Sequence, residues 1–290
     1  MKAMIKNAII CGGIHGNELT GVYLIKHWQK NPEILKRSHF NTHTIIGNPR
    51  AVQNNSRFVD SDLNGCFKRK LKLNHYESHR AKEIEKFILA KGNIENTAVF
   101  DLHTTTSHMG ITLILTDPNP WNFACVQYVK SKIDDVNIYT YFTDEPSGHL
   151  NCLTRLGLTV EIGPVFNSTL DSFAFFKTQE IIQHCLDFIE LSHKIQIEYY
   201  LEGQLETYQQ TGSILYPLDK DGELNCFIHP HFLKRNFKLL KEGEPLFKTF
   251  NGKDILYSGT ETYPVFIGET SFYKKTACLT TMQKLISINR

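Results

Sequence analysis

The chain has 290 residues, of which 41% are hydrophobic and 21% charged, the composition of a globular protein with a sizeable core. Its 32 basic and 30 acidic side chains are spread along the sequence and give a formal net charge of +2, so neither nucleic acid nor a membrane surface is an expected partner. No run approaches the roughly 20 apolar residues of a membrane span and nothing resembles an export signal, so we expect a cytoplasmic protein that binds a small molecule.

Strand-like and helix-like segments alternate over the first two thirds of the chain. Apolar runs predict buried strands at residues 7–11, 42–46, 98–102, 111–115, 136–142 and 157–162. Apolar residues that recur at three- and four-residue spacing predict helices at 19–29, 76–90 and 181–191. This alternation indicates an α/β fold, a mixed but largely parallel sheet flanked by helices.

The sequence changes in character after about residue 195. Short alternating stretches at 195–200, 246–250 and 263–267 are separated by glycine-containing turns at 219–222 and 251–252. We therefore predict two domains, a catalytic α/β domain over residues 1–194 and a smaller β-rich domain over 195–290. Because no flexible linker separates them, we expect the two domains to pack closely.

The strongest local motif is Gly-Gly-Ile-His-Gly-Asn-Glu at 12–18, where a predicted strand passes into a predicted helix. Open α/β sheets bind ligands at the carboxyl ends of their strands, and there His15 and Glu18, three residues apart, can converge on one metal ion. A second strand ends in Asp-Leu-His, so His103 can supply a third ligand and Asp101 can orient a ligating imidazole. Two histidines and one glutamate leave the fourth position of zinc open for water, which predicts one catalytic zinc ion per chain.

Each half of this pattern also has an ordinary explanation. A His-x-x-Glu pair is most often a solvated helix pair or a cap, and a single histidine at a strand end is most often hydrogen-bonded in the core or at the surface. The two together favour zinc more than either does alone, although their spacing leaves the ordinary explanation open.

Six motifs resemble, in order and spacing, the aspartoacylase family, which belongs with the succinylglutamate desuccinylases and shares the zinc carboxypeptidase fold. The match extends from about residue 8 to about residue 275. The motifs are Gly-Gly-Ile-His-Gly-Asn-Glu-Leu-Thr-Gly (12–21), Gly-Asn-Pro-Arg-Ala-Val (47–52), Arg-Phe-Val-Asp-Ser-Asp-Leu-Asn (57–64), Phe-Asp-Leu-His-Thr-Thr (100–105), Val-Glu-Ile-Gly-Pro (160–164) and Tyr-Pro-Val-Phe-Ile-Gly-Glu (263–269).

The resemblance implies that His15, Glu18 and His103 bind the zinc ion. It also implies that Glu161 is the general base that accepts a proton from water and returns it to the leaving amine. From its local sequence alone, Glu161 would be a solvated carboxylate at a strand end. A smaller C-terminal domain packed on the active-site side is also what the family implies.

Three further polar residues match substrate-handling groups of the family. Arg57 matches an arginine that faces the scissile carbonyl and stabilises the oxyanion. Asn64 and Arg155 match groups that hold the carboxylates of the substrate, the arginine through a bidentate fork. Without the resemblance, Arg57 would be one member of a surface ion pair, and the other two would be ordinary surface residues.

The sequence departs from the family pattern at the substrate anchors. An arginine usually follows the asparagine of Asp-Leu-Asn, and here that position is Gly65. Two adjacent tyrosines near the C-terminus are replaced by Phe272 and Tyr273, so the second would act only if the loop shifts by one residue. Of two lysines that usually follow, the first falls on Lys275 and the second on Thr276. Apolar or aromatic N-acyl amino acids would tolerate these losses better than N-acetylaspartate does.

These features predict a zinc-dependent amidohydrolase acting on an N-acyl-L-amino acid, with N-acetyl-L-aspartate, cleaved to L-aspartate and acetate, as the first candidate. The enzymatic alternative is a hydrolase of succinylated, aromatic or neutral N-acyl amino acids. The alternative from another class is a binding protein that retains zinc but has reduced catalysis. The sequence does not determine the oligomeric state, and a homodimer is the one assembly that it leaves as an alternative to a monomer.

Overall fold

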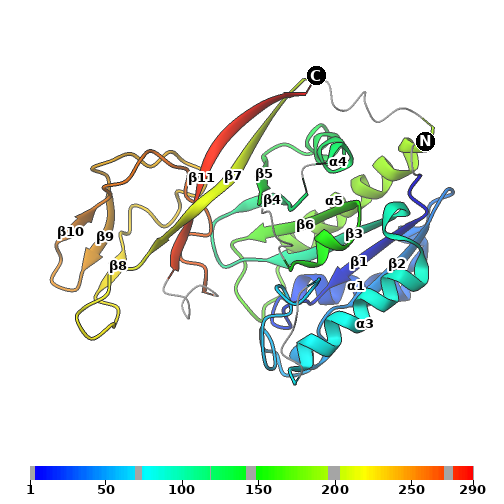
Figure 1. Ribbon diagram of the computed structural model, residues 1–290, viewed down its shortest axis with the longest axis horizontal. Helices are drawn as coiled ribbons and strands as arrows, with labels where there is room; N and C mark the ends of the chain where they lie inside the picture. The colour runs from blue at the N-terminus through cyan, green and yellow to red at the C-terminus, as the bar shows by residue number, and fades with distance from the viewer. Residues whose placement is uncertain are drawn as a thin grey trace.

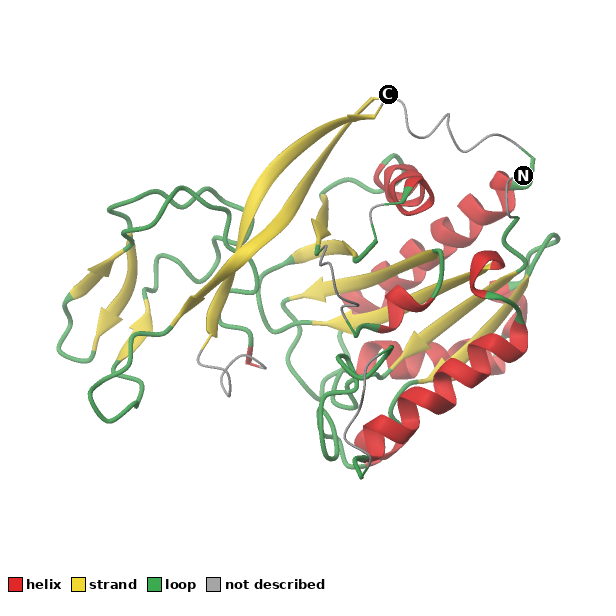
Figure 2. Ribbon diagram, in the orientation of Figure 1, coloured by secondary structure: helices red, strands yellow, loops and turns green. Residues whose placement is uncertain are grey.

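The computed structural model describes residues 4–68, 74–117, 119–141, 148–194, 203–270 and 277–289. An eight-stranded sheet runs through the molecule, with helices on both faces of its larger part (Figure 1, Figure 2). In spatial order its strands are β11 (Ala277–Asn289), β7 (Gly203–Leu215), β5 (Val136–Thr140), β4 (Gly110–Leu115), β6 (Leu156–Gly163), β3 (Thr97–Thr104), β1 (Asn7–Gly12) and β2 (Asn41–Ile46).

The helices form one layer on each face of this sheet. They are α1 (Leu19–Lys30), α2 (Pro49–Gln53), α3 (Tyr76–Lys91), α4 (Pro120–Lys130) and α5 (Ser172–Ser192), with the short 3-10 helices η1 (Pro32–Leu35), η2 (Ile94–Asn96) and η3 (Leu150–Leu153). In β1, Ala8 and Ile10 pack in the cluster that includes residues of α1, α4 and α5, whereas Ile9 and Cys11 pack with α3. Because both faces of the strand are covered, its sequence is a continuous apolar run.

Strand direction places the carboxyl ends of four strands at one edge. β2, β1, β3 and β6 run parallel to one another, and β4 then pairs antiparallel with β6. β5 is parallel to β4, so strand direction reverses between β6 and β4 in the middle of the sheet. The loops that follow β1, β3 and β6 therefore meet at the same edge of the sheet.

The C-terminal part of the chain extends this sheet and adds a second one. β7 pairs parallel with β5 and antiparallel with β11, so two long strands continue the large sheet. β8 (Cys226–Ile228), β9 (Pro245–Thr249) and β10 (Asp254–Leu256) form a separate antiparallel sheet, away from the helices in Figure 1. The boundary predicted between residues 194 and 195 adjoins residues 195–202, which are outside the described ranges.

Most predicted elements agree with the structure to within a few residues, although the predicted helix at 181–191 is the C-terminal half of the longer α5. The alternating stretch at 263–267 is different, because Val265 makes only an isolated bridge to Thr280. Helix α4 was not predicted, although Asn119 caps it by accepting a hydrogen bond from the Asn122 backbone and Pro120 is its first residue. The predicted strand at 195–200 lies outside the described residues. No described helix is long and apolar enough to cross a membrane.

Candidate active site

Two neighbouring parallel strands bring the predicted metal ligands together. His15 and Glu18 lie on the turn between β1 and α1, and His103 is the seventh residue of β3. Because β1 and β3 pair in parallel register, the turn after β1 reaches the end of β3. One ligand atom from each residue lies within 4.8 Å of the others, and all three side chains are buried. Within the described part of the chain, no other group of three His, Cys, Asp or Glu side chains offers such an arrangement.

The Glu18 carboxylate bridges the two imidazoles. Its Oε1 lies 2.6 Å from His15 Nδ1, and its Oε2 lies 2.8 Å from His103 Nδ1. The backbone N–H of Thr104 donates to the same Oε2 at 3.1 Å. The Nδ1 atoms of both rings therefore face the Glu18 carboxylate. A shared cation would lie between these two nitrogens and that carboxylate.

The other nitrogen of each imidazole faces a second carboxylate. His15 Nε2 lies 3.0 Å from Asp62 Oδ1, and His103 Nε2 lies 2.9 Å from Asp101 Oδ2. A carboxylate behind a ligating histidine fixes the tautomer and orientation of its ring. Asp101 takes the position that the sequence predicts. Asp62 was not singled out by sequence, although it lies within the motif at 57–64.

The donor set and its electrostatics fit a zinc ion. Two imidazoles and one carboxylate are ligands of catalytic zinc sites, and each imidazole here lies between two carboxylates. Burial acts to raise the pKa of Glu18, but the charges of His15 and His103 outweigh it and hold that pKa well below its usual range. Burial acts to lower the pKa of His103, but Asp101 and Glu18 raise it well above its usual range. The group of His15, Glu18 and His103, called the cluster below, therefore favours positive charge at its centre.

Arg57 lies beside this cluster on the loop that precedes Asp62. Its guanidinium nitrogens lie 3.4 Å from Glu18 Oε1 and 3.3 Å from Asp62 Oδ2. The backbone N–H of Gly16 donates to the Arg57 carbonyl at 3.2 Å. This bond ties the Arg57 loop to the turn at residues 13–18, called the ligand turn below because it carries His15 and Glu18. The Arg57 side chain is 29% exposed, so it can face both the cluster and a substrate.

Glu161 is opposite His103 on the adjacent strand β6. Side chains at paired positions of parallel strands project to the same face, so the two groups share one side of the sheet. Glu161 is buried, and its Oε1 has no hydrogen-bond partner among the described residues. Burial raises its pKa well above the usual range, and the negative charges of Glu18 and Glu269 act in the same direction. A buried carboxylate with a free acceptor beside the cluster is suited to take a proton from water.

Asn64 completes this side of the cluster. Its Nδ2 lies 3.3 Å from His103 Nε2, and its backbone N–H donates to Asp62 Oδ1 at 3.0 Å. Its side-chain oxygen is buried without a partner among the described residues. The structure thus brings Asn64 to the cluster, and its role in holding a substrate carboxylate, which the family resemblance implies, stays a prediction.

Known proteins match this chain over nearly its whole length. The family profile described as "Succinylglutamate desuccinylase/Aspartoacylase catalytic domain" matches residues 4–189, and that described as "AstE/AspA barrel-sandwich hybrid domain" matches residues 203–284. The chain belongs to the succinylglutamate desuccinylase/aspartoacylase family.

Individual relatives of this family cover both halves of the chain. A probable aspartoacylase of Trichodesmium erythraeum is 37% identical over 98% of this chain and 99% of its own length. An N-acyl-aromatic-L-amino acid amidohydrolase (carboxylate-forming) of Xenopus laevis is 32% identical over 98% and 96%. The crystal structure of murine aminoacylase 3 has a TM-score of 0.89 at 28% identity, covering 99% of this chain and 98% of that one. These similarities confirm the predicted family and fold, and they agree with the predicted class of enzyme, an amidohydrolase.

The structure does not bring Arg155, the substrate anchor that the family resemblance implies, to the cluster. It precedes β6 at the amino end of the strand, and its neighbour Leu156 pairs with Ala98 at the start of β3. Glu161 is six residues further along, about 20 Å away at the rise of a strand. The Arg155 guanidinium instead lies 3.3 Å from Glu95 Oε2 at the opposite edge of the sheet. Arg155 and Glu161 are close in sequence, but strand β6 runs between them and places them at opposite edges of the sheet. Arg155 is therefore far from the cluster.

Gly65 has a backbone conformation that suits glycine. Its φ is +114°, a region that residues with a side chain rarely adopt, and its N–H donates to the Gly148 carbonyl at 2.7 Å. Among the described residues, a Cβ at Gly65 would meet only the Asp62 carbonyl oxygen, at 4.0 Å, so these residues leave room for a side chain there. A Cβ at Gly148 would lie 2.7 Å from the Gly65 Cα, so the two loops are in backbone contact. The other predicted substrate-site residues, Phe272 and Tyr273, together with Lys275 and Thr276, lie outside the described residues.

His149, which the sequence did not indicate, lies next to the cluster. Burial lowers the pKa of His149 to about 4. The negative charge of Asp101 acts to raise this pKa, and the positive charge of His103 acts to lower it. The ring is therefore neutral near pH 7. It stacks on Tyr141, with ring centroids 6.0 Å apart and an interplanar angle of 26°. An aromatic pair thus adjoins the candidate site on the side of the Gly65–Gly148 contact.

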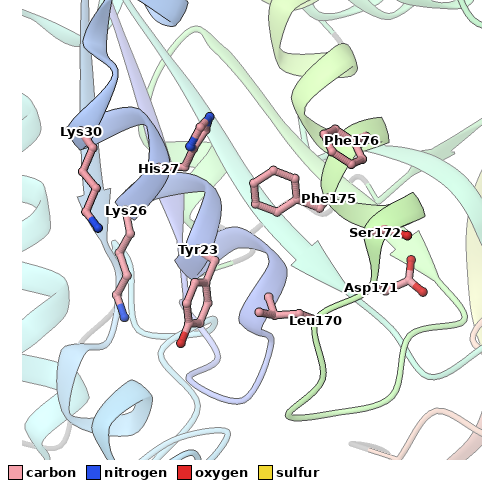
Figure 3. Close-up of a pocket in the computed structure, with 9 residues that line it drawn as sticks. All are labelled: Tyr23, Lys26, His27, Lys30, Leu170, Asp171, Ser172, Phe175 and Phe176. Carbon is pink, nitrogen blue, oxygen red and sulfur yellow. The ribbon is translucent and has the colours of Figure 1, made fainter.

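A separate cavity of about 470 Å³ lies between α1 and the start of α5. Figure 3 shows the side chains that surround it, with those of α1 on one side and the apolar side chains at the start of α5 on the other. Its lining residues are Tyr23, Lys26, His27, Lys30, Leu170, Asp171, Ser172, Phe175 and Phe176. None of the predicted metal ligands lines this cavity, and neither does Glu161, so it is separate from the candidate active site.

Proposed function

We propose that this protein is a zinc-dependent amidohydrolase that removes the acyl group from an N-acyl-L-amino acid. One zinc ion per chain would be held by His15, Glu18 and His103. The observation that carries the proposal is the convergence of these three side chains beside the buried Glu161 carboxylate. A bound zinc ion would polarise the acyl carbonyl and lower the pKa of a water molecule at its open position.

Residues of the chain would then carry the proton and the developing charge. The Glu161 carboxylate accepts a proton from the attacking water and returns it to the nitrogen of the leaving amine as the carbon–nitrogen bond breaks. The Arg57 guanidinium, fixed beside Glu18 and Asp62, faces the oxygen on which negative charge develops. The products are a carboxylate and a free amino acid.

N-acetyl-L-aspartate is the first candidate substrate, because several similar proteins are named aspartoacylases. A second candidate is an N-acyl aromatic amino acid, as in the name of the Xenopus laevis relative. Two observations favour the second candidate, the absence of a side chain at Gly65 and the aromatic pair of Tyr141 and His149 beside the cluster. An aromatic side chain can pack against such a pair without a cationic anchor.

The test is a substrate profile measured on zinc-loaded protein. We expect release of free amino acid from N-acetyl-L-aspartate or from N-acetylated aromatic amino acids, loss of this activity after chelation, and its return when zinc is added. Activity that is identical in chelated and zinc-loaded samples would contradict the metal assignment. A zinc-loaded protein inactive on every N-acyl amino acid would favour the binding-protein alternative.

A further inference from the structure

Glu77, in the first turn of α3, is a buried carboxylate outside the cluster described above. Its exposed fraction is 0%, although an acidic residue in the first turn of a helix is usually solvated and acts on the helix dipole. No described Lys or Arg forms an ion pair with it. A buried carboxylate without a cationic partner needs hydrogen-bond donors instead.

Four N–H groups from other segments supply these donors. Glu77 Oε1 accepts from the Val59 backbone at 2.7 Å and from Asn48 Nδ2 at 2.9 Å. Glu77 Oε2 accepts from the backbones of Asp60 and Ser61 at 3.0 and 3.1 Å. Three consecutive amides of one loop therefore point at a single side chain. The shape of the loop from residue 59 to residue 61 is thus set by Glu77.

This loop carries two groups of the candidate active site at its ends. Arg57 precedes the three amides, and Asp62 follows them directly. Asp62 holds the Nε2 side of His15 and accepts from the Arg57 guanidinium. A shift of the loop would therefore move the carboxylate behind one metal ligand and the cation that faces the substrate together.

The fourth donor connects Glu77 to the ligand turn by a second route. Asn48, whose side chain donates to Glu77, is fully buried, and its backbone N–H donates to the Gly13 carbonyl at 2.8 Å. Its Oδ1 accepts from the Ala51 backbone at the start of α2. The ligand turn lies against this helix, because a Cβ at Gly16 would be 2.1 Å from the Ala51 carbonyl carbon. Glu77 thus joins α3 to the loop at residues 59–61 and to the segment that begins at Asn48. Both of these lie against the turn that carries His15.

We infer that Glu77 is a positioning residue for this active site, one that fixes the loop carrying Arg57 and Asp62 and thereby the orientation of His15. The inference rests on the proposed function for its kinetic consequence, but its consequence for zinc binding does not depend on the substrate. Carboxylates behind metal ligands typically change metal affinity or activity about 10- to 100-fold when they are lost. Since Glu77 acts through Asp62, we expect an effect toward the lower end of that range.

The first experiment measures zinc affinity by chelator competition for wild type and Glu77→Gln. Glutamine keeps the size of the side chain, but its NH2 group would face the amides of Asp60 and Ser61, so two acceptor contacts are lost. We expect zinc binding about 10-fold weaker, with a cooperative thermal transition retained. Glu83→Gln is the matched control, because Glu83 lies on the same helix with a side chain 63% exposed and should bind zinc as wild type does.

The second experiment measures kcat/KM at saturating zinc in two backgrounds. If Glu77 acts by placing Arg57, Glu77→Gln should lower kcat/KM about 10-fold in wild type but less than threefold in an Arg57→Ala background. A general structural defect would instead give the same factor in both. This non-additivity separates positioning from a loss of stability.

Each outcome decides the inference. Wild-type zinc affinity in a folded Glu77→Gln protein, or an equal loss of kcat/KM in both backgrounds, would overturn it. If Glu77→Gln does not fold, Glu77→Asp, which keeps the charge but shortens the reach, is judged by the same two measurements. A wild-type protein that cleaves no N-acyl amino acid would remove the proposed function, and the zinc measurement would still decide the role of Glu77.

Discussion

His103 and Glu161 are paired residues on the neighbouring parallel strands β3 and β6. The pairing places a proposed metal ligand and a buried carboxylate side by side at the carboxyl edge of the sheet. A hydrolase needs this adjacency, because the group that takes the proton from water must lie next to the group that activates the water.

Replacing Glu161 by glutamine should leave zinc bound and reduce turnover. Glutamine keeps the shape of the side chain but cannot accept the proton, so we expect kcat to fall about 10²- to 10⁴-fold. Zinc content and steady-state kinetics on the same sample provide the measurement. Glu95→Gln, at the opposite edge of the sheet, is the control. Unchanged turnover would remove Glu161 from the mechanism.

The pH dependence of kcat/KM should reflect the environment of Glu161. A general base acts only when ionised, so activity is lost as pH falls through its pKa. Burial raises this pKa, which moves the acidic limb to a higher pH than the value of about 4.3 for an ordinary glutamate. The positive charges of His103 and Arg57 act in the opposite direction. A bound zinc ion would add to their effect. A limb at or below pH 4 would show that these charges prevail over burial.

Replacement by alanine should lower activity strongly at Arg57 and hardly at all at Arg155. Loss of Arg57 removes the cation beside the cluster, and we expect kcat to fall about 10²- to 10³-fold, as for other oxyanion-stabilising groups. Among the described residues, loss of the Arg155 side chain removes an ion pair with Glu95 and no contact with the cluster, so kcat/KM should stay within about twofold of wild type. Kinetics on both variants, with zinc content as a check, test this contrast. A large loss in Arg155→Ala would restore the substrate role that the family resemblance implies.

A cation introduced at Gly65 should shift the enzyme toward acidic substrates. Because Gly65 has a φ of +114°, any side chain there costs about 1–3 kcal/mol of stability. Gly65→Ala carries the same backbone strain without the charge and is the matched control. Relative to that control, Gly65→Arg should raise kcat/KM for N-acetyl-L-aspartate about 10-fold or more over N-acetyl-L-phenylalanine. Equal ratios in the two variants would mean that the charge is not used.

Glu269 should contribute to stability through its contacts with the loop after His103. Its carboxylate accepts hydrogen bonds from the Thr105 hydroxyl and from the Thr106 hydroxyl and backbone, the latter two at 3.0 and 2.9 Å. Glu269→Ala leaves these donors without this acceptor, so we expect the free energy of unfolding to fall by about 3 kcal/mol in urea titration. The exposed Glu261→Ala should change it by less than about 0.5 kcal/mol. Equal stability of the two variants would contradict this role.

The sequence predicts the parts of the fold and site that have local patterns. β1 and α1 follow from their apolar periodicity, and His15 and Glu18 follow from a single motif between them. Strand direction is not local, so the reversal at β4 and the remote position of Arg155 could not be predicted from their own residues.

The supporting carboxylates escaped prediction for a similar reason. Asp62 and Glu77 act on groups that lie 47 and 16 to 29 residues away, and no spacing rule connects them. In sequence, Glu77 is an ordinary acidic residue at the start of a helix. Its four donors are brought to it only by the packing of α3 against the sheet.

The bonds between Glu269 and the two threonines also bear on the order in which the active site is completed. Every proposed metal ligand and the base are translated by residue 161, yet the loop behind His103 receives these bonds only after residue 269 has left the ribosome. The growing chain therefore carries these proposed groups for more than a hundred residues before Glu269 is available to hold that loop.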